Sequence, residues 1–209
     1  MKILNLTEAA DALVAGRVLA LPTDTVYGLA AVAANPVAVE LIFEAKRRPR
    51  DVALPIMVPS PSTVADLGVD WPEAAQSLAA AFWPGALTIV VPVDRDIAQR
   101  FGTTDAVGFR QPNRADLLEI LEKTGPLAVT SANLHGESPC TTVADVIAQF
   151  TDNVVSGALD GGACEGVVST VVRLGSGWEI LRHGAISEGE ISRVLGPREP
   201  EGGSALQLG

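Results

Sequence analysis

The sequence predicts a single α/β domain with a twisted mixed sheet flanked by helices. Short β-branched runs alternate with helical patterns along almost all of the 209 residues, as is typical of α/β folds. Two late strand patterns follow one another with only a hairpin-like turn between them, so the sheet is expected to be mixed rather than purely parallel. We expect one domain over residues 1–196 and a polar, glycine-rich flexible tail over 197–209.

The first half of the chain carries clear helix boundaries. Thr7 is a good N-cap and Gly16 a good stop, and Asn35 precedes Pro36 as an N-cap precedes a first helical residue. The second of these helices delivers Lys46 at its C-terminal end. In order, we predict a helix over 7–16, a strand over Val18–Leu21, a helix over 36–46, a strand over 54–58, a helix opening at Pro72, a turn at 83–85 and a strand over 86–91.

The second half repeats the alternation. Thr142 and Asp145 have the spacing of a capping box, and Gly175 and Gly177 frame a hairpin-like turn. In order, we predict a strand over 106–109, a helix over 114–123, a strand over 127–130, a helix over 142–150, strands over 168–173 and 178–181, and a closing helix over Glu188–Leu195.

Composition excludes several classes of protein. The apolar fraction of 47% excludes a disordered chain, and the longest uncharged stretch is too short and too often broken by proline and glycine to span a bilayer. The first residues do not form a secretory leader, so we expect a cytoplasmic protein without membrane contact. The formal charge of −10 argues against a general nucleic-acid binder. Two cysteines and two histidines give little support to a disulfide framework, a zinc site or a Ser/His/Asp triad.

Four polar segments lie between the apolar strands, where binding residues of α/β proteins usually gather. They are 22–28, 46–50, 130–133 and the pair Ser169–Thr170, with Arg182 near the last in sequence. Each segment alone has an ordinary explanation as a turn, a solvated helix end or an N-cap. Because the chain contains neither a Walker A loop nor a G-x-G-x-x-G sequence after a strand, any nucleotide must bind in another way.

Taken together, the segments resemble the YrdC/Sua5 family of threonylcarbamoyl-AMP synthases from residue 4 to about residue 195. Their order and spacing match as well. The strings that carry the resemblance are LPTDTVYGL (21–29), IFEAKRRP (42–49), FWPGALT (82–88), VGFR (107–110), SAN (131–133), STV (169–171) and LRHG (181–184).

The resemblance implies a YrdC-like fold with a concave basic site and a defined reaction. L-Threonine, bicarbonate and ATP would give threonylcarbamoyl-AMP and pyrophosphate, and the product would pass to a tRNA-modifying transferase complex. Clustered cations suit this transfer because charge grows on the leaving pyrophosphate. Mg²⁺ is expected to arrive with ATP. The residues matched to ATP are Lys46 and Arg48, which are also the catalytic candidates, with Ser131, Asn133, Ser138, Thr141 and Arg182.

The residues matched to threonine are Thr25, Arg110 and Ser169, and Arg110 would hold the carboxylate through two parallel hydrogen bonds. Three departures from the family pattern bear on the site. Arg47 replaces a usual glycine, and Met57 replaces a histidine that would donate to threonine. The sequence SPCT (138–141) stands where family members often have Ser-Pro-Thr, which leaves open whether Ser138 or Thr141 faces the nucleotide. From the length of 209 residues we expect the short YrdC-like type.

Two alternatives remain open. A carbamoyl-adenylating domain of the hydrogenase-maturation kind shares the fold, although such proteins carry further regions that do not fit into 209 residues. A noncatalytic RNA-binding module is the other alternative, and the acidic net charge weighs against it and allows at most weak binding of tRNA. Likeness of fold cannot by itself separate a catalyst from a protein that only binds.

Overall fold

The computed structural model describes residues 1–47, 53–134, 136–151 and 154–198. Within these ranges the strands are β1 (Lys2–Leu4), β2 (Val18–Leu21), β3 (Gly28–Val32), β4 (Ile56–Met57), β5 (Leu87–Pro92), β6 (Ala106–Arg110), β7 (Leu127–Ser131), β8 (Val155–Leu159), β9 (Thr170–Leu174) and β10 (Trp178–Arg182). The helices are α1 (Leu6–Val14), α2 (Pro36–Lys46), α3 (Pro61–Asp66), α4 (Glu73–Phe82), α5 (Arg95–Arg100), α6 (Ala115–Thr124), α7 (Val143–Gln149) and α8 (Glu188–Leu195).

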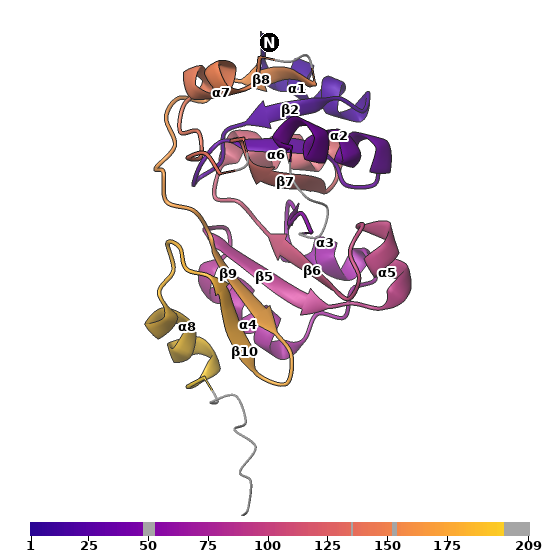
Figure 1. The fold of residues 1–209 in the computed structure, drawn as a ribbon. Coiled ribbons are helices and arrows are strands. Elements are labelled where there is room, and N and C mark those ends of the chain that lie inside the picture. The colour runs from indigo at the N-terminus through magenta and orange to yellow at the C-terminus, as the bar shows by residue number, and fades with distance from the viewer. Residues whose placement is uncertain (48–52, 135, 152–153, 199–209) are drawn as a thin grey trace, which may run out of the picture.

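The described strands form one sheet in the order β1-β8-β2-β3-β7-β4-β6-β5-β9-β10. Four neighbouring pairs are parallel, namely β1/β8, β8/β2, β4/β6 and β5/β9, and the remaining pairs are antiparallel. The prediction of an α/β domain with a mixed sheet is therefore confirmed. Figure 1 shows the sheet twisting between an upper half, from β8 to β7, and a lower half, from β6 to β10.

Helices cover the sheet in groups. In the upper half α1 packs against α6, and Leu13 and Leu121 from these helices are buried with Leu19 and Val129 of the sheet. In the lower half α4 packs against α8. Burying a leucine side chain stabilises the folded chain by about 1.5–3 kcal/mol. These apolar helix faces therefore stabilise the two halves of the sheet. In the described part of the chain, every helix is too short or too polar to cross a membrane.

Local sequence explains where the main helices begin. Asn5 accepts a hydrogen bond from the backbone N–H of Glu8, whose side chain returns to the Asn5 N–H, so a capping box opens α1. The prediction that Thr7 caps this helix was wrong. The N-cap is Asn5, two residues before Thr7, because Asn5 forms a capping box with Glu8. The predicted cap of α2 at Asn35 and the capping box of α7 are confirmed.

Several elements differ from the predictions. The strand predicted over 54–58 is reduced to β4, since Pro55 has no N–H to donate to a neighbouring strand. The strands β1, β3 and β8 and the short helices α3 and α5 were not predicted. Of the predicted tail over 197–209, Pro197 and Arg198 alone lie within the described residues.

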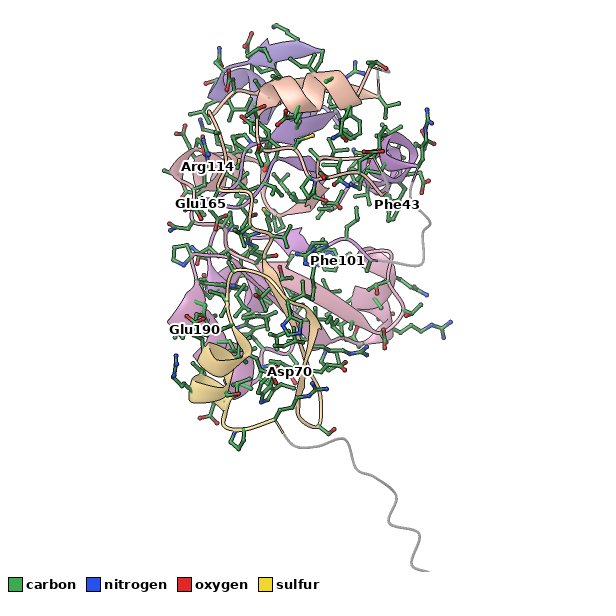
Figure 2. The ribbon with its side chains drawn as sticks, turned by 60° about the vertical axis from the view of Figure 1, so that its left-hand side comes forward. Phe43, Asp70, Phe101, Arg114, Glu165 and Glu190 are labelled. Atoms are coloured by element: carbon green, nitrogen blue, oxygen red, sulfur yellow. The ribbon has the colours of Figure 1, made fainter. Side chains whose placement is uncertain are left out.

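A small second cavity of about 200 Å³ lies between α2 and the end of α5. Phe43 and Phe101, both labelled in Figure 2, line it together with Leu54. Leu54 also borders the larger cavity, which is lined by half of the predicted site residues.

Candidate active site

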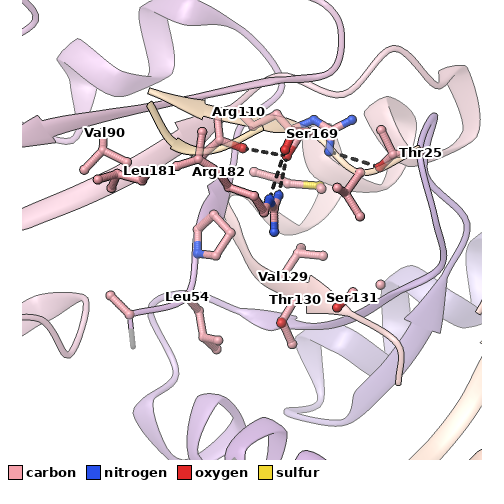
Figure 3. Close-up of a pocket in the computed structure, with 18 of the residues that line it drawn as sticks. Thr25, Leu54, Val90, Arg110, Val129, Thr130, Ser131, Ser169, Leu181 and Arg182 are labelled. Atoms are coloured by element: carbon pink, nitrogen blue, oxygen red, sulfur yellow. Dashed lines mark hydrogen bonds between the residues drawn. The ribbon is translucent and has the colours of Figure 1, made fainter. Parts of the chain in front are cut away.

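A cavity of about 560 Å³ lies between the two halves of the twisted sheet. One wall comes from the turn after β2 and from β7, and the opposite wall comes from β5, β6, β9 and β10. Figure 3 shows Thr25, Arg110 and Ser169 gathered at one end, with Val90, Leu181 and Leu54 at the other. The structure brings together these predicted site residues along the cavity: Thr25, Arg110, Ser131, Ser169 and Arg182.

The turn after β2 is organised by the hydroxyl of Thr23. Its Oγ1 accepts from the backbone N–H groups of Thr25 (3.0 Å) and Val26 (3.2 Å) and donates to the Val26 carbonyl (2.7 Å). That donation uses the single hydroxyl proton of Thr23. The 2.9 Å contact between the Thr23 and Thr25 hydroxyls therefore has Thr25 as its donor, and the Thr25 oxygen is left to accept from other groups.

Arg110, at the end of β6, is only 4% exposed, and each nitrogen of its guanidinium has an acceptor. Nε donates to the Gly85 carbonyl (2.9 Å), Nη1 to Thr25 Oγ1 (3.2 Å) and Nη2 to Asp24 Oδ1 (2.7 Å). Burial lowers the pKa of the guanidinium, and the Asp24 carboxylate opposes that change. Since arginine has five N–H groups, these three bonds leave one N–H on each terminal nitrogen for a ligand.

The turn between α4 and β5 places the acceptor for Arg110 Nε. Gly85 lies just after the cis peptide bond Trp83–Pro84, and its N–H donates to the Gln111 carbonyl (2.9 Å). A Cβ on Gly85 would collide with the carbonyl of Phe82, so this approach of the backbone requires glycine. The FWPGALT string therefore contributes to the site through a backbone carbonyl.

Ser169 connects the two late strands to the cavity. Arg182 Nε donates to the Ser169 carbonyl (3.0 Å) and Nη2 to its Oγ (2.8 Å), which also lies 3.1 Å from the Thr88 hydroxyl. The register of β9 and β10 shifts between Ile180 and Arg182, and such a bulge lets Leu181 and Arg182 both line the cavity. An arginine expected at the nucleotide thus touches a serine expected at threonine.

Lys46 is buried at the end of α2, behind the segment that follows β7. Its Nζ donates to the Ser131 carbonyl and to the Asn133 carbonyl (2.6 Å) and side-chain oxygen (3.2 Å). Ser131 Oγ donates to that same side-chain oxygen (2.6 Å). In this arrangement the ammonium orders the segment 131–133, and Ser131 is the member of the cluster that lines the cavity.

The remaining predicted residues are not part of the described lining of the cavity. Arg48 is outside the described residues. Ser138 is exposed, and Thr141 donates through its hydroxyl to Asp145 (3.4 Å); neither is among the described residues that border the cavity. Met57 does line the cavity and is buried, so an apolar thioether stands where the family pattern has a histidine.

Two site residues escaped the sequence analysis. Asp24 contacts Arg110, and the buried hydroxyl of Thr88 contacts Ser169. Both lie within strings quoted for the resemblance. Thr88 could have been noticed as a polar residue in an apolar run, and Asp24 as a carboxylate next to Thr25. Neither pattern indicates which residue the side chain contacts.

The arrangement can bind an anion at one end of the cavity and an apolar group at the other. Arg110 and Arg182 supply cationic N–H donors, and Thr25, Thr88 and Ser169 supply hydroxyl groups beside them. Among the described residues no cluster of three His, Cys, Asp or Glu side chains could hold a metal ion.

Comparison with known proteins agrees with the fold. A protein-family model for Sua5, YciO and YrdC proteins, described as "Telomere recombination", matches residues 11–184. The chain is 38% identical over 198 residues to the threonylcarbamoyl-AMP synthase of Bacillus subtilis, covering 92% of this chain and 57% of the relative. It is 37% identical over 198 residues to the putative threonylcarbamoyl-AMP synthase of Mycobacterium tuberculosis H37Rv, covering 92% of this chain and 89% of the relative.

Among solved structures, the crystal structure of Pyrococcus abyssi Sua5 complexed with L-threonine superposes with a TM-score of 0.85 at 37% identity, covering 91% of this chain and 57% of that chain. The sheet order and the cavity between the two halves of the sheet define an α/β protein of the YrdC-like class. The chain belongs to the Sua5, YciO and YrdC family. It spans a little over half of the Bacillus relative and most of the Mycobacterium relative.

Proposed function

We propose that this protein is a threonylcarbamoyl-AMP synthase, a nucleotidyltransferase that joins L-threonine, bicarbonate and ATP. The observation that carries the proposal is the buried Arg110, which keeps one N–H on each terminal nitrogen for a carboxylate beside Thr25 and Ser169. The names of relatives at 37–38% identity support the same activity. The Sua5 structure with L-threonine supports threonine as a substrate.

Threonine is proposed to bind at the polar end of the cavity. Its carboxylate would accept two parallel hydrogen bonds from Arg110, a geometry that suits a planar guanidinium and not an ammonium. The Thr25 oxygen, which acts as an acceptor, suits an N–H or O–H of the substrate better than its carboxylate. Ser169 lies on the adjoining wall of the cavity.

The nucleotide is proposed to lie along Arg182 and Ser131, with Lys46, Arg48 and Asn133 in the predicted roles of ATP contacts. The threonine amine forms a bond to the carbon of bicarbonate, and a carbon–oxygen bond of bicarbonate breaks with loss of water, which leaves a carbamate. A carbamate oxygen then forms a bond to the α-phosphorus, and the bond from that phosphorus to the bridging oxygen breaks with release of pyrophosphate. Arg182, which lines the cavity and donates to Ser169, would offset the charge that grows during this step.

Mg²⁺ is proposed to enter with ATP. Mg²⁺ usually keeps several waters and binds through phosphate oxygens, so the donor set of the described residues is compatible with an ion carried by the nucleotide. In that position the ion would neutralise phosphate charge. The residues of the chain would then hold and orient the two substrates.

Partners beyond the substrates are also proposals. The product would pass to a tRNA-modifying transferase complex, and direct binding of tRNA is expected to be weak because the net charge is −10. The alternatives of an RNA-binding module and a carbamoyl-adenylating domain are less favoured, since the relatives quoted above are named for threonylcarbamoyl-AMP synthesis. A cytoplasmic location stays a prediction from the sequence.

Pyrophosphate release that depends on threonine tests the proposal. Purified protein with ATP, Mg²⁺ and bicarbonate should release pyrophosphate only when L-threonine is added. Arg110→Ala should raise the threonine KM by the equivalent of about 1.5–3 kcal/mol, a charged hydrogen bond, and leave the affinity for ATP nearly unchanged. Arg114→Ala is the matched control, because Arg114 pairs with Asp116 away from the cavity. Equal effects of the two substitutions would contradict the assignment of Arg110.

A further inference from the structure

Asp24 is the only carboxylate that the structure pairs with the buried guanidinium of Arg110 in the described part of the chain. Its side chain is 13% exposed and is joined to Arg110 Nη2 at 2.7 Å. The cavity is lined by Thr23 and Thr25, and Asp24 between them is absent from its described lining. The carboxylate therefore contacts the guanidinium from outside the described lining of the cavity.

The geometry of the turn makes this contact specific. Thr23 fixes the backbone from 23 to 26 with three hydrogen bonds, and Arg110 receives acceptors from both Asp24 and Thr25. The third acceptor, the Gly85 carbonyl, approaches Nε. Each nitrogen is thus held once, which fixes both the position and the rotation of the planar group. Loss of any acceptor would free the guanidinium to turn.

We propose that Asp24 is a positioning residue for amino-acid binding, acting through Arg110 so that the guanidinium presents the same pair of N–H groups to each incoming carboxylate. The inference rests on the proposed function, because it takes the carboxylate to be that of threonine. Asp24 also supplies the negative charge that a cation buried to this extent requires. Of these two contributions, the placement of the acceptor is the one that decides affinity for the amino acid.

Placement and charge can be separated by two substitutions. Asp24→Asn removes the charge but keeps an oxygen acceptor at the same distance from the backbone. Asp24→Glu keeps the charge but adds one methylene group, which displaces the carboxylate and with it Arg110. Asp116→Asn and Asp116→Glu are the matched controls, since Asp116 pairs with Arg114 at 2.9 Å in a second Asp–Arg contact outside the cavity.

The measurement is calorimetric titration of L-threonine and of L-threoninol, which lacks the carboxylate, into the full-length wild type and these four variants. Melting temperatures and the affinity for ATP serve as checks on folding. We expect Asp24→Glu to weaken threonine binding on the order of tenfold or more and to reduce the preference for threonine over threoninol. Asp24→Asn should stay within about threefold of wild type, and both Asp116 variants should match wild type.

Wild-type affinity in Asp24→Glu, or equal losses in Asp24→Glu and Asp24→Asn, would overturn the positioning role. A stronger loss in Asp24→Asn than in Asp24→Glu would overturn it too, because charge alone would then decide binding. These outcomes are distinct from failure of the proposed function. In that case wild-type protein would show no threonine-dependent release of pyrophosphate, while the binding series could still be compared.

Discussion

The guanidinium of Arg110 is fixed by acceptors from two turns that lie about sixty residues apart in the chain, at Asp24–Thr25 and at Gly85. The family resemblance was enough to select Arg110, Thr25 and Ser169, because each stands in a quoted string. It could not select Asp24 as the partner of Arg110. That contact depends on the turn that Thr23 organises and on the distance between this turn and Arg110. A local sequence pattern does not encode such a distance.

The backbone conformation of Arg47 is expected to lower the stability of the protein. It ends α2 with φ at 51°, in the left-handed region that favours glycine, and the resembling family usually has glycine there. Arg47→Gly should raise the free energy of unfolding by about 0.5–1 kcal/mol in urea denaturation. The left-handed region costs a residue with a Cβ about 1–2 kcal/mol, and the greater conformational entropy that glycine loses on folding offsets part of that gain. Arg47→Ala is the control and should give no gain. A gain with alanine as large as with glycine would contradict this explanation.

Among the elements, those with strong end signals could be predicted and those made of small residues could not. The caps at Asn35 and Thr142 marked α2 and α7 correctly. In contrast, β3 reads GLAAV and β8 reads VSGAL, sequences with low intrinsic strand preference. These strands exist because they pair on both sides within the sheet, a tertiary effect that is not visible in local sequence.

The capping boxes of α1, α7 and α8 predict a dependence of stability on pH. Hydrogen bonds from the N-cap residues lower the pKa values of Glu8, Asp145 and Glu190 from their ordinary values of 4.5, 3.8 and 4.5. A carboxyl with a lower pKa in the folded chain stabilises it above the unfolded pKa, and that stabilisation is lost as the pH falls through the folded value. Wild type should therefore lose stability as the pH drops below 4.5.

The variant carrying Glu8→Gln, Asp145→Asn and Glu190→Gln tests this dependence. Its melting temperature at neutral pH should be lower than that of wild type, and the gap should narrow in acid. Thermal denaturation followed by circular dichroism at a series of pH values provides the measurement. A gap of constant size across the series would show that the three carboxylates do not contribute through their ionised forms.

Substitution of Gly184 tests how closely the segment after β10 packs against the start of β9. A Cβ at this position would collide with the backbone at Val168, Ser169 and Thr170, and this backbone carries the Ser169 contact with Arg182. Gly184→Ala should lower stability by about 1–3 kcal/mol and raise the threonine KM. Gly189→Ala in α8, where a Cβ meets nothing within 4 Å, should instead be neutral or stabilising. Urea denaturation should therefore show a lower free energy of unfolding for Gly184→Ala and an unchanged or higher one for Gly189→Ala.

At the scale of the whole molecule, the cavity exists because the sheet twists between its two halves. Thr25 and Ser131 come from the upper half, and Arg110, Ser169 and Arg182 come from the lower half. The alternation of elements could predict an α/β domain but not this strand order. Strand order depends on which distant segments pair, so the meeting of the two residue sets could be expected only from the family resemblance.

Residues 197–209 are expected to form a polar tail with little apolar surface to bury. Deleting them should change neither the melting temperature nor the rate of pyrophosphate release appreciably. A matched truncation at residue 187 would remove α8, whose Ile191 is fully buried, and should lower the melting temperature strongly. A large effect of the shorter deletion would show that the tail contributes to the fold or to the site.

The most direct test of the central claim is mass spectrometry of the product formed with ¹³C-labelled bicarbonate. Protein incubated with ATP, Mg²⁺, L-threonine and the labelled bicarbonate should yield threonylcarbamoyl-AMP that is one mass unit heavier than the product from unlabelled bicarbonate. The labelled carbon should lie in the carbamoyl group, and the product should be absent when threonine is omitted. Formation of AMP and pyrophosphate without the labelled adduct, or no product from folded protein that binds threonine, would contradict the account.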